Sequence, residues 1–310
     1  MVTTAADLGV LMAAIATPYD AEGAVDTGLL STLIGDYVAR GVEGIYCCGS
    51  SGEGLLLSAD ERTAVVETAV SAAEGRIPVV AHVGALSTRE AIELARRAQQ
   101  AGASALSMIP PIYYSFGIEA VLDHYRAVLD AVDLPLIVYN IPQFTGTEFT
   151  VETAGELLDD DRVIGLKQTA HNMYALERMK TAFPDKAYIN GFDEVFVPAV
   201  AAGARGTIGT TVGLQVELFQ AARRLLDAGD LEHDASRLDV GDPPLHGTLA
   251  GAHADLGRLL GERTIGVDVD EHLAATLHVA GHGDTRRLDL TVGDVGRRER
   301  LDAVVAEREL

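Results

Sequence analysis

Only three lysines occur in the 310 residues, and one of them follows an apolar run in "RVIGLKQTA", residues 162–170. This residue, Lys167, ends the expected strand Val163–Lys167, whereas Lys180 and Lys186 flank the helix-end and loop sequence "TAFPD". Burial disfavours the protonated form of an amine, and a neutral amine attacks a ketone to form a Schiff base, whose iminium is an electron sink. Lys167 is therefore predicted to be a catalytic nucleophile. The alternative is a structural lysine paired with a carboxylate.

A Schiff-base enzyme also needs an acid–base group and a site for the carboxylate of its keto-acid substrate. Tyr139 ends the preceding expected strand, Pro135–Tyr139, and its phenol is a candidate proton carrier. Ser50 and Ser51 lie in the Gly-flanked turn "GSSGE" and offer hydroxyl and backbone N–H groups to a carboxylate. Taken singly, the tyrosine fits ordinary strand packing and "GSSGE" fits a plain turn, so the prediction depends on the combination.

Short apolar runs that alternate with segments of helical periodicity must position these residues. The expected strands are Val10–Ala16, Gly44–Cys48, Pro78–Val83, Ala105–Ile109, Pro135–Tyr139, Val163–Lys167, Ala187–Asn190 and Gly206–Gly209. Ser58 and Ser87, each with Glu three residues later, are typical helix starts, and Gly41, Gly102 and Gly203 are typical helix ends. The pattern predicts an α/β fold, a (β/α)₈ TIM barrel. The runner-up, an open doubly wound sheet, would be favoured by GxGxxG after the first strand, where "ATPYDAEGAVD" stands instead.

In such a barrel, reactive side chains lie at the C-terminal ends of the strands. Five expected strand ends carry polar groups, namely "CGSSGE" (48–53), "PPIYY" (110–114), "YNIP" (139–142), Lys167 with Thr169, and "NGFDE" (190–194). We therefore expect hydroxyls, phenols, one amine and two carboxylates to converge on one rim of the barrel.

The formal net charge of −22 argues against a nucleic-acid partner and against an anionic membrane surface, since both are bound through Lys and Arg. Cys47 and Cys48 are the only cysteines and are adjacent, so neither a disulfide framework nor a CxxC metal knuckle is expected. No signal peptide and no membrane-length apolar run is visible, and the histidines have no compact ligand spacing. We expect a cytoplasmic protein without a bound metal.

The motifs "GSSGE", "YNIP", "GLKQT" and "NGFDE", in this order and at these spacings, resemble the pyruvate-dependent Schiff-base aldolases that include N-acetylneuraminate lyase and dihydrodipicolinate synthase. The resemblance runs from about residue 8 to 230. It implies a class I aldolase without a cofactor, in which Lys167 forms the Schiff base, Tyr139 carries the proton, and Ser50 and Ser51 hold the carboxylate. It further implies that Tyr114, or its neighbour Tyr113, completes a proton relay across a subunit interface in a homo-oligomer, a dimer of dimers.

Within this family, the synthases carry an Arg after the "YN-P" motif for a second substrate carboxylate, whereas this chain has "YNIPQFTGT" with Phe144. A phenyl ring cannot bind a carboxylate. The sequence is more similar to the neuraminate-lyase branch, in which hydroxyl-rich substrate tails are received at positions matching Gly191, Asp193, Glu194, Thr169 and Thr210. The alternative for the acidic pair is a helix N-terminus that favours acidic residues.

The resemblance implies cleavage of N-acetylneuraminate to pyruvate and N-acetylmannosamine. Three alternatives stay open: an aldolase or dehydratase of another 2-keto-3-deoxy sugar acid, a synthase-like condensation, and a non-catalytic barrel that binds keto acids.

Two regions are expected, a catalytic barrel over residues 1–230 and a C-terminal extension over residues 231–310. The extension departs from the family pattern, because Gly often interrupts its helical periodicity and most of the histidines fall there. We expect it to be largely helical, with "RRERLDAVVAEREL" at its end as an amphipathic helix. It is either divergent or frame-shifted between about residues 231 and 295.

Overall fold

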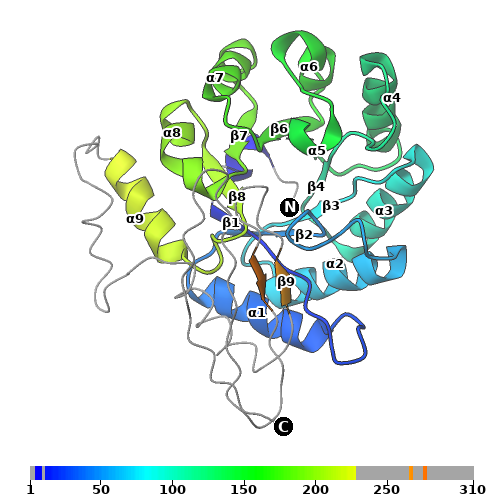
Figure 1. Cartoon of the computed structure of the whole chain (residues 1–310), viewed down its shortest axis with the longest axis vertical. Coiled ribbons are helices and arrows are strands. Elements are labelled where there is room, and N and C mark those ends of the chain that lie inside the picture. Colours follow the sequence, from blue (N-terminus) through cyan, green and yellow to red (C-terminus); the bar gives the residue numbers. More distant parts are fainter. Residues whose placement is uncertain (1–3, 9–10, 228–264, 268–274, 278–310) are drawn as a thin grey trace, which may run out of the picture.

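The protein is described by a computed structural model over residues 4–8, 11–227, 265–267 and 275–277. Eight parallel strands close into a barrel in chain order, and β1 pairs with β8 to complete it (Figure 1). The strands are β1 (Leu11–Ala14), β2 (Gly44–Cys47), β3 (Val79–His82), β4 (Ala105–Met108), β5 (Leu136–Asn140), β6 (Val163–Gln168), β7 (Ala187–Asn190) and β8 (Gly206–Gly209). The predicted TIM barrel is confirmed, and closure excludes the open doubly wound sheet.

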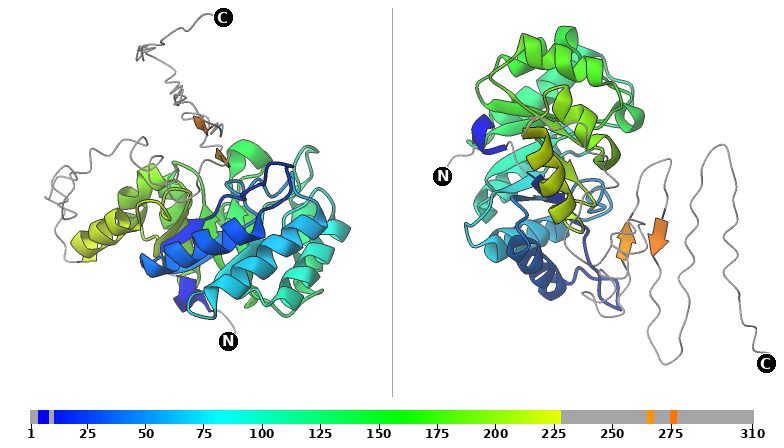
Figure 2. Two further views of the ribbon diagram at one scale, coloured as in Figure 1. Left: turned by 90° about the horizontal axis from the view of Figure 1, so that it is seen from below. Right: turned by 90° about the vertical axis from the view of Figure 1, so that its left-hand side faces the viewer.

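The helices form a ring outside the strands, and α1, α2 and α3 pack side by side (Figures 1 and 2). They are α1 (Thr27–Ala39), α2 (Ala59–Ala73), α3 (Thr88–Ala101), α4 (Ile118–Leu129), α5 (Pro142–Thr145), α6 (Val151–Leu158), α7 (Met173–Ala182), α8 (Phe196–Ala201) and α9 (Val216–Asp227). The described residues also include two 3₁₀ turns, η1 (Ala5–Leu8) and η2 (Asp193–Val195). None of the helices described here combines the length and the apolar character needed to cross a membrane.

Each expected strand is present, with ends that shift by no more than two residues among those described. The two strands that carry the candidate catalytic residues, β5 and β6, run one residue further than expected, to Asn140 and Gln168. These two residues are register partners, and Asn140 Nδ2 donates a hydrogen bond of 2.7 Å to Gln168 Oε1. This side-chain bond extends the ladder past the apolar run that marked the strands in the sequence.

Apolar side chains pack in two layers on either side of the strands. The larger layer joins the outer strand faces to the helices, through residues such as Leu33, Val65 and Leu122. The smaller layer fills the barrel interior and includes Met12, Tyr46 and Tyr139. Leu8 of η1 belongs to this interior cluster, and η1 contacts β6 and β7. The interior is therefore a packed core, and Tyr139 belongs both to this core and to the candidate site at the C-terminal ends of the strands.

The predicted capping box at the start of α2 is present. Ser58 Oγ accepts a hydrogen bond from Glu61 N, and the Glu61 carboxylate accepts one of 2.8 Å from Ser58 N. Because a lost N-cap costs roughly 0.5–2 kcal/mol, Ser58→Ala should lower the free energy of unfolding by about 1 kcal/mol in a urea titration. Ser58→Thr keeps the cap and serves as the control. Equal stability of the two variants would show that the cap contributes nothing.

The described part of the C-terminal extension consists of two short strands, β9 (Ile265–Val267) and β10 (Ala275–Leu277), which pair antiparallel. The rest of the region expected over 231–310 lies outside the described residues. Its expected helical character, its final amphipathic helix and its divergence or frame shift therefore stay predictions.

Candidate active site

Lys167 lies on the inner face of the barrel, one strand away from its register partner Tyr139. Both side chains are buried, with 4% and 3% of their surface exposed. The nitrogen Nζ of Lys167 lies 3.9 Å from the ring centre of Tyr139 and 4.7 Å from that of Tyr46. No salt bridge among the described residues involves Lys167, so the structure offers no support for a lysine held by a carboxylate.

The phenol of Tyr139 is placed to exchange protons with this amine. Burial raises its pKa, but the charge of Lys167 and polar contacts with Thr169, Lys167 and Ser50 lower it, and the net pKa lies below the usual value. A lowered phenol pKa suits an acid–base group, because proton transfer is most efficient when the pKa lies near the working pH. Tyr139 therefore lies in an environment that differs from ordinary strand packing.

Ser50 and Ser51 follow β2 in a tight turn at the rim of the barrel. The Ser51 hydroxyl lies 2.6 Å from the Thr210 hydroxyl, which joins the ends of β2 and β8. Thr17 Oγ1 donates a hydrogen bond of 2.7 Å to Gly52 O, and a Cβ built at Gly54 would overlap the carbonyl of Cys48. The turn is thus held from two sides and presents hydroxyl groups next to Tyr139.

The acidic pair lies at the end of β7, where Asp193 turns towards β8. Its Oδ2 accepts hydrogen bonds of 2.7 Å and 2.8 Å from the N–H and hydroxyl groups of Thr211, whereas Glu194 is exposed. Asp193 Oδ1 is buried without a partner, and a Cβ built at Gly209 would overlap it. Burial raises the pKa of Asp193 more than Lys167 and Thr211 lower it. The Asp193 carboxylate therefore connects the end of β7 to Thr211 in the loop after β8.

Thr169 and Gly191 form the wall between Lys167 and the acidic pair. A Cβ built at Gly191 would overlap Thr169 Oγ1 and lie 3.1 Å from Lys167 Cε. Thr169 Oγ1 is buried and has no hydrogen-bond partner of standard geometry. Because this buried hydroxyl lies next to the amine and has hydrogen-bonding capacity left over, a substrate could bind to it.

Tyr113 and Tyr114, by contrast, are not brought to Lys167 within one chain. Their side chains are 88% and 69% exposed, and their rings meet edge to face at 4.9 Å. Tyr113 has a φ of 77°, in the left-handed region that tyrosine seldom adopts. Their predicted role in a proton relay requires a partner chain to cover them.

Two interior residues escaped the sequence analysis, Tyr46 and His82. Tyr46 contacts the amine from the middle of β2, and its hydroxyl lies 3.1 Å from the Ser107 hydroxyl. His82 ends β3 and packs against Tyr46 and Tyr139. Neither residue belongs to one of the motifs, but side-chain alternation along β2 and β3 predicts that both point inward. In the described part of the chain, no group of three or more His, Cys, Asp or Glu side chains could hold a metal ion.

Comparison with known proteins agrees with this geometry. Residues 7–250 match the model of the dihydrodipicolinate synthetase family. The chain is 41% identical to an N-acetylneuraminate lyase of Rhizobium meliloti (strain 1021) over 230 residues, which cover 74% of this chain and 76% of that protein. An Escherichia coli (strain K12 / DH10B) N-acetylneuraminate lyase is 38% identical over 229 residues, with 74% and 77% covered.

Solved structures give the same result. A catalytic lysine mutant of the Ruminococcus gnavus sialic acid aldolase superimposes with a TM-score of 0.72 at 31% identity, covering 75% of this chain and 76% of that one. The dihydrodipicolinate synthase from Aquifex aeolicus superimposes with a TM-score of 0.69 at 29% identity, and 81% of each chain is covered. The chain belongs to the dihydrodipicolinate synthetase family.

Proposed function

We propose that the protein is a class I aldolase, a carbon–carbon lyase that cleaves N-acetylneuraminate to pyruvate and N-acetylmannosamine. The observation that carries the proposal is a buried lysine amine 3.9 Å from the ring of a tyrosine whose phenol has a lowered pKa. The similarity to the N-acetylneuraminate lyases of two bacteria supports the choice of substrate.

The reaction begins when Lys167 Nζ attacks the C2 ketone. The Tyr139 phenol donates its proton to the departing hydroxide, so that water leaves and an iminium forms on the lysine. The Tyr139 phenolate then accepts the proton of the C4 hydroxyl while the C3–C4 bond breaks, and the bonding electrons enter the iminium to form an enamine. The C4 fragment leaves as an aldehyde. Protonation of the enamine at C3 and hydrolysis by water release pyruvate and regenerate the amine, so no cofactor takes part.

The remaining rim residues bind the two ends of the substrate. Ser50 and Ser51 hold the C1 carboxylate beside Tyr139 through hydroxyl and backbone N–H groups. The hydroxyl-rich tail lies toward the ends of β7 and β8, where five residues contact it: Thr169, Gly191, Asp193, Glu194 and Thr210.

The proposal includes a homo-oligomer, a dimer of dimers, in which Tyr114 or Tyr113 of one subunit completes the proton relay of another. The exposed rings of Tyr113, Tyr114 and Phe116 support it, because a second copy would cover them. It also includes a cytoplasmic location. Both cysteines of the chain, Cys47 and Cys48, are free thiols, as is usual in a reducing compartment.

A panel of 2-keto acids with pyruvate release as the readout tests the substrate. N-acetylneuraminate should give the highest kcat/KM, above 2-keto-3-deoxy sugar acids with shorter tails. A higher kcat/KM for a sugar acid with a shorter tail would show that the protein is an aldolase of that acid instead. Condensation of pyruvate with an aldehyde that carries a carboxylate should be absent, because Phe144 stands where a synthase carries an Arg. If no sugar acid is turned over and no lysine adduct forms, the remaining alternative is a non-catalytic barrel that binds keto acids.

The tail-binding role of Asp193 can be tested without changing Asp193 itself. Gly209→Ala places a methyl group where Asp193 Oδ1 lies and should displace the carboxylate. Because hydrogen bonds to charged groups contribute about 1.5–3 kcal/mol, KM for N-acetylneuraminate should rise roughly 10-fold or more. Borohydride trapping of pyruvate should stay at the wild-type level.

Gly35→Ala on α1, where a Cβ meets no neighbour, is the matched control and should leave KM unchanged. An unchanged KM in Gly209→Ala, with the fold intact, would remove Asp193 from the tail site.

A further inference from the structure

His82 is the last residue of β3 and packs against Tyr46 and Tyr139 inside the barrel, yet no step of the proposed reaction uses it. Its imidazole is buried, with 4% of the residue exposed. The ring centre lies 6.0 Å from that of Tyr139, with the two planes at 87°, and 6.3 Å from that of Tyr46. These are the two rings that flank the amine of Lys167. The imidazole therefore packs behind the pair of rings that defines the position of the nucleophile.

The hydrogen bonding of the ring indicates its protonation state. The backbone N–H of Ile109 donates to His82 Nε2 at 3.3 Å, so Nε2 is an acceptor and carries no proton. The imidazole is therefore neutral, with its proton on Nδ1, which has no hydrogen-bond partner of standard geometry. Burial, and then the positive charges of Arg62 and Lys167, hold the pKa of His82 well below its usual value, against a smaller opposing effect of the Cys48 backbone.

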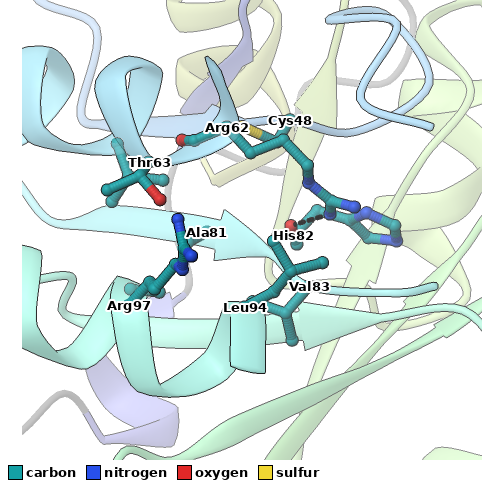
Figure 3. Close-up of a pocket in the computed structure, with 10 residues that line it drawn as sticks. Cys48, Arg62, Thr63, Ala81, His82, Val83, Leu94 and Arg97 are labelled. Carbon is teal, nitrogen blue, oxygen red and sulfur yellow. Dashed lines mark hydrogen bonds between the residues drawn. The ribbon is translucent and has the colours of Figure 1, made fainter. Parts of the chain in front are cut away.

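The end of β3 is fixed from the helix layer by Arg62 of α2. Arg62 is 4% exposed, and its guanidinium donates hydrogen bonds to the carbonyl oxygens of His82 (Figure 3) and of Gly84. The cavity behind it, which Cys48 and Leu94 also line, has a volume of about 10 Å³. It can hold about one water molecule and no organic substrate. Arg62 thus fixes the end of β3 through these two hydrogen bonds and does not bind a substrate in this cavity.

The ring itself has little freedom to move. A Cβ built at Gly84 would lie 2.8 Å from His82 Cε1 and 2.9 Å from Nε2, so the Gly84 backbone closes one side of the ring. Tyr46 and Tyr139 close the other side, and Ile109 holds one edge. The charged and titratable side chains around the imidazole are Tyr46, Arg62, Tyr139 and Lys167.

We propose that His82 is a positioning residue for the proposed lyase reaction: a neutral imidazole that holds the Tyr139 phenol against Lys167 and keeps a second positive charge away from the iminium. The inference rests on the proposed function. Loss of the ring would open a void behind Tyr139, and small misplacements of a catalytic group cost up to about 10²-fold in rate. Protonation of the ring would place like charges in one buried site and disfavour the iminium.

The first test compares three variants by kcat and by borohydride trapping of pyruvate. His82→Ala should lower kcat about 10- to 100-fold, whereas His82→Phe, which keeps an uncharged ring in place, should recover most of that loss. Both variants should still be trapped, because Lys167 remains. His124→Ala removes another buried histidine, which lies on α4 and bonds Thr88, and should leave kcat unchanged.

The second test separates positioning from general packing through the pH profile of kcat/KM. Arg62→Met removes the fixed charge and should raise the pKa of His82, so the acid limb should move to higher pH. Arg62→Lys keeps the positive charge and should therefore shift the acid limb less than Arg62→Met does. In Arg62→Met combined with His82→Phe the shift should disappear, because no imidazole is left to protonate. If Arg62→Met does not fold, the comparison of His82→Ala with His82→Phe still decides.

The failures are distinguishable. Wild-type protein that is neither trapped with pyruvate nor active on any sugar acid would refute the proposed function and this inference with it. Trapping of all variants together with wild-type kcat in His82→Ala would refute only the role of His82. Equal losses of kcat in His82→Ala and His82→Phe, together with an unshifted acid limb in Arg62→Met, would also refute only the role of His82.

Discussion

Replacement of Lys167 by alanine is expected to abolish the borohydride-stable pyruvate adduct and to lower kcat/KM for N-acetylneuraminate by about 10⁴-fold or more. Loss of a covalent nucleophile has effects of this order, because the remaining groups only bind the substrate. In the wild-type protein, mass spectrometry of a digest should place the adduct on the peptide that contains residue 167. The fold should survive, since the alanine removes a buried polar group from a largely apolar interior.

The other two lysines supply the control for this experiment. Lys180 is exposed at the end of α7, and Lys186 Nζ donates hydrogen bonds to Asp160 O and Val163 O at 2.9 Å and 2.7 Å. Lys180→Ala should keep both the adduct and the activity. An adduct that persists in Lys167→Ala, or wild-type turnover in that variant, would contradict the Schiff-base mechanism.

Replacement of Tyr139 by phenylalanine is expected to lower kcat about 10²- to 10⁴-fold, the usual contribution of a positioned acid–base group. The phenyl ring keeps the contact with Lys167 Nζ at 3.9 Å from its centre, so the amine should still be trapped by pyruvate, although more slowly. Phe149, which is buried against Tyr125 outside the barrel interior, offers a control through Phe149→Leu. A kcat near the wild-type value in Tyr139→Phe would remove the phenol from the proton pathway.

The lowered pKa of Tyr139 also predicts a pH dependence. Schiff-base formation needs a proton for the departing hydroxide, so activity should fall as pH rises through the pKa of the phenol. Because that pKa lies below the ordinary value of 10.0, the alkaline limb of kcat/KM should begin below pH 10. The limb should be absent from the residual activity of Tyr139→Phe. If Tyr139→Phe showed the same alkaline limb, the limb would belong to another titrating group.

Most of the barrel could be predicted from the sequence, because the signals that specify it are local. Short runs that contain β-branched or aromatic residues form strands, as in β7 and β8, whose bounds match the expectation. The capping box at Ser58 closes within one turn, and Gly41, Gly102 and Gly203 end their helices with φ values of 90°, 88° and 105°. Such features depend on a few neighbouring residues and not on the rest of the fold.

The candidate site was predicted only in part, because its other features depend on how separate elements meet. Asp193 begins the 3₁₀ turn η2, as its alternative at a helix start expects, but the sequence did not predict that its carboxylate bonds Thr211, 18 residues away in the chain. His82 and Tyr46 carried no motif, and their proximity to Lys167 arises from barrel closure. Tyr113 and Tyr114 were expected at a site, but a single chain leaves them exposed.

The sequence by itself thus determined the family, the order of the strands and the identity of the one lysine at a strand end. These follow from local periodicity and from motifs at fixed spacing along the chain. Only the tertiary structure decided which side chains surround that lysine. Parallel strands that are distant in sequence place Tyr46, His82, Tyr139 and Lys167 in one interior layer. Burial and charge within that layer, rather than residue type, then set the protonation of the phenol and of the imidazole.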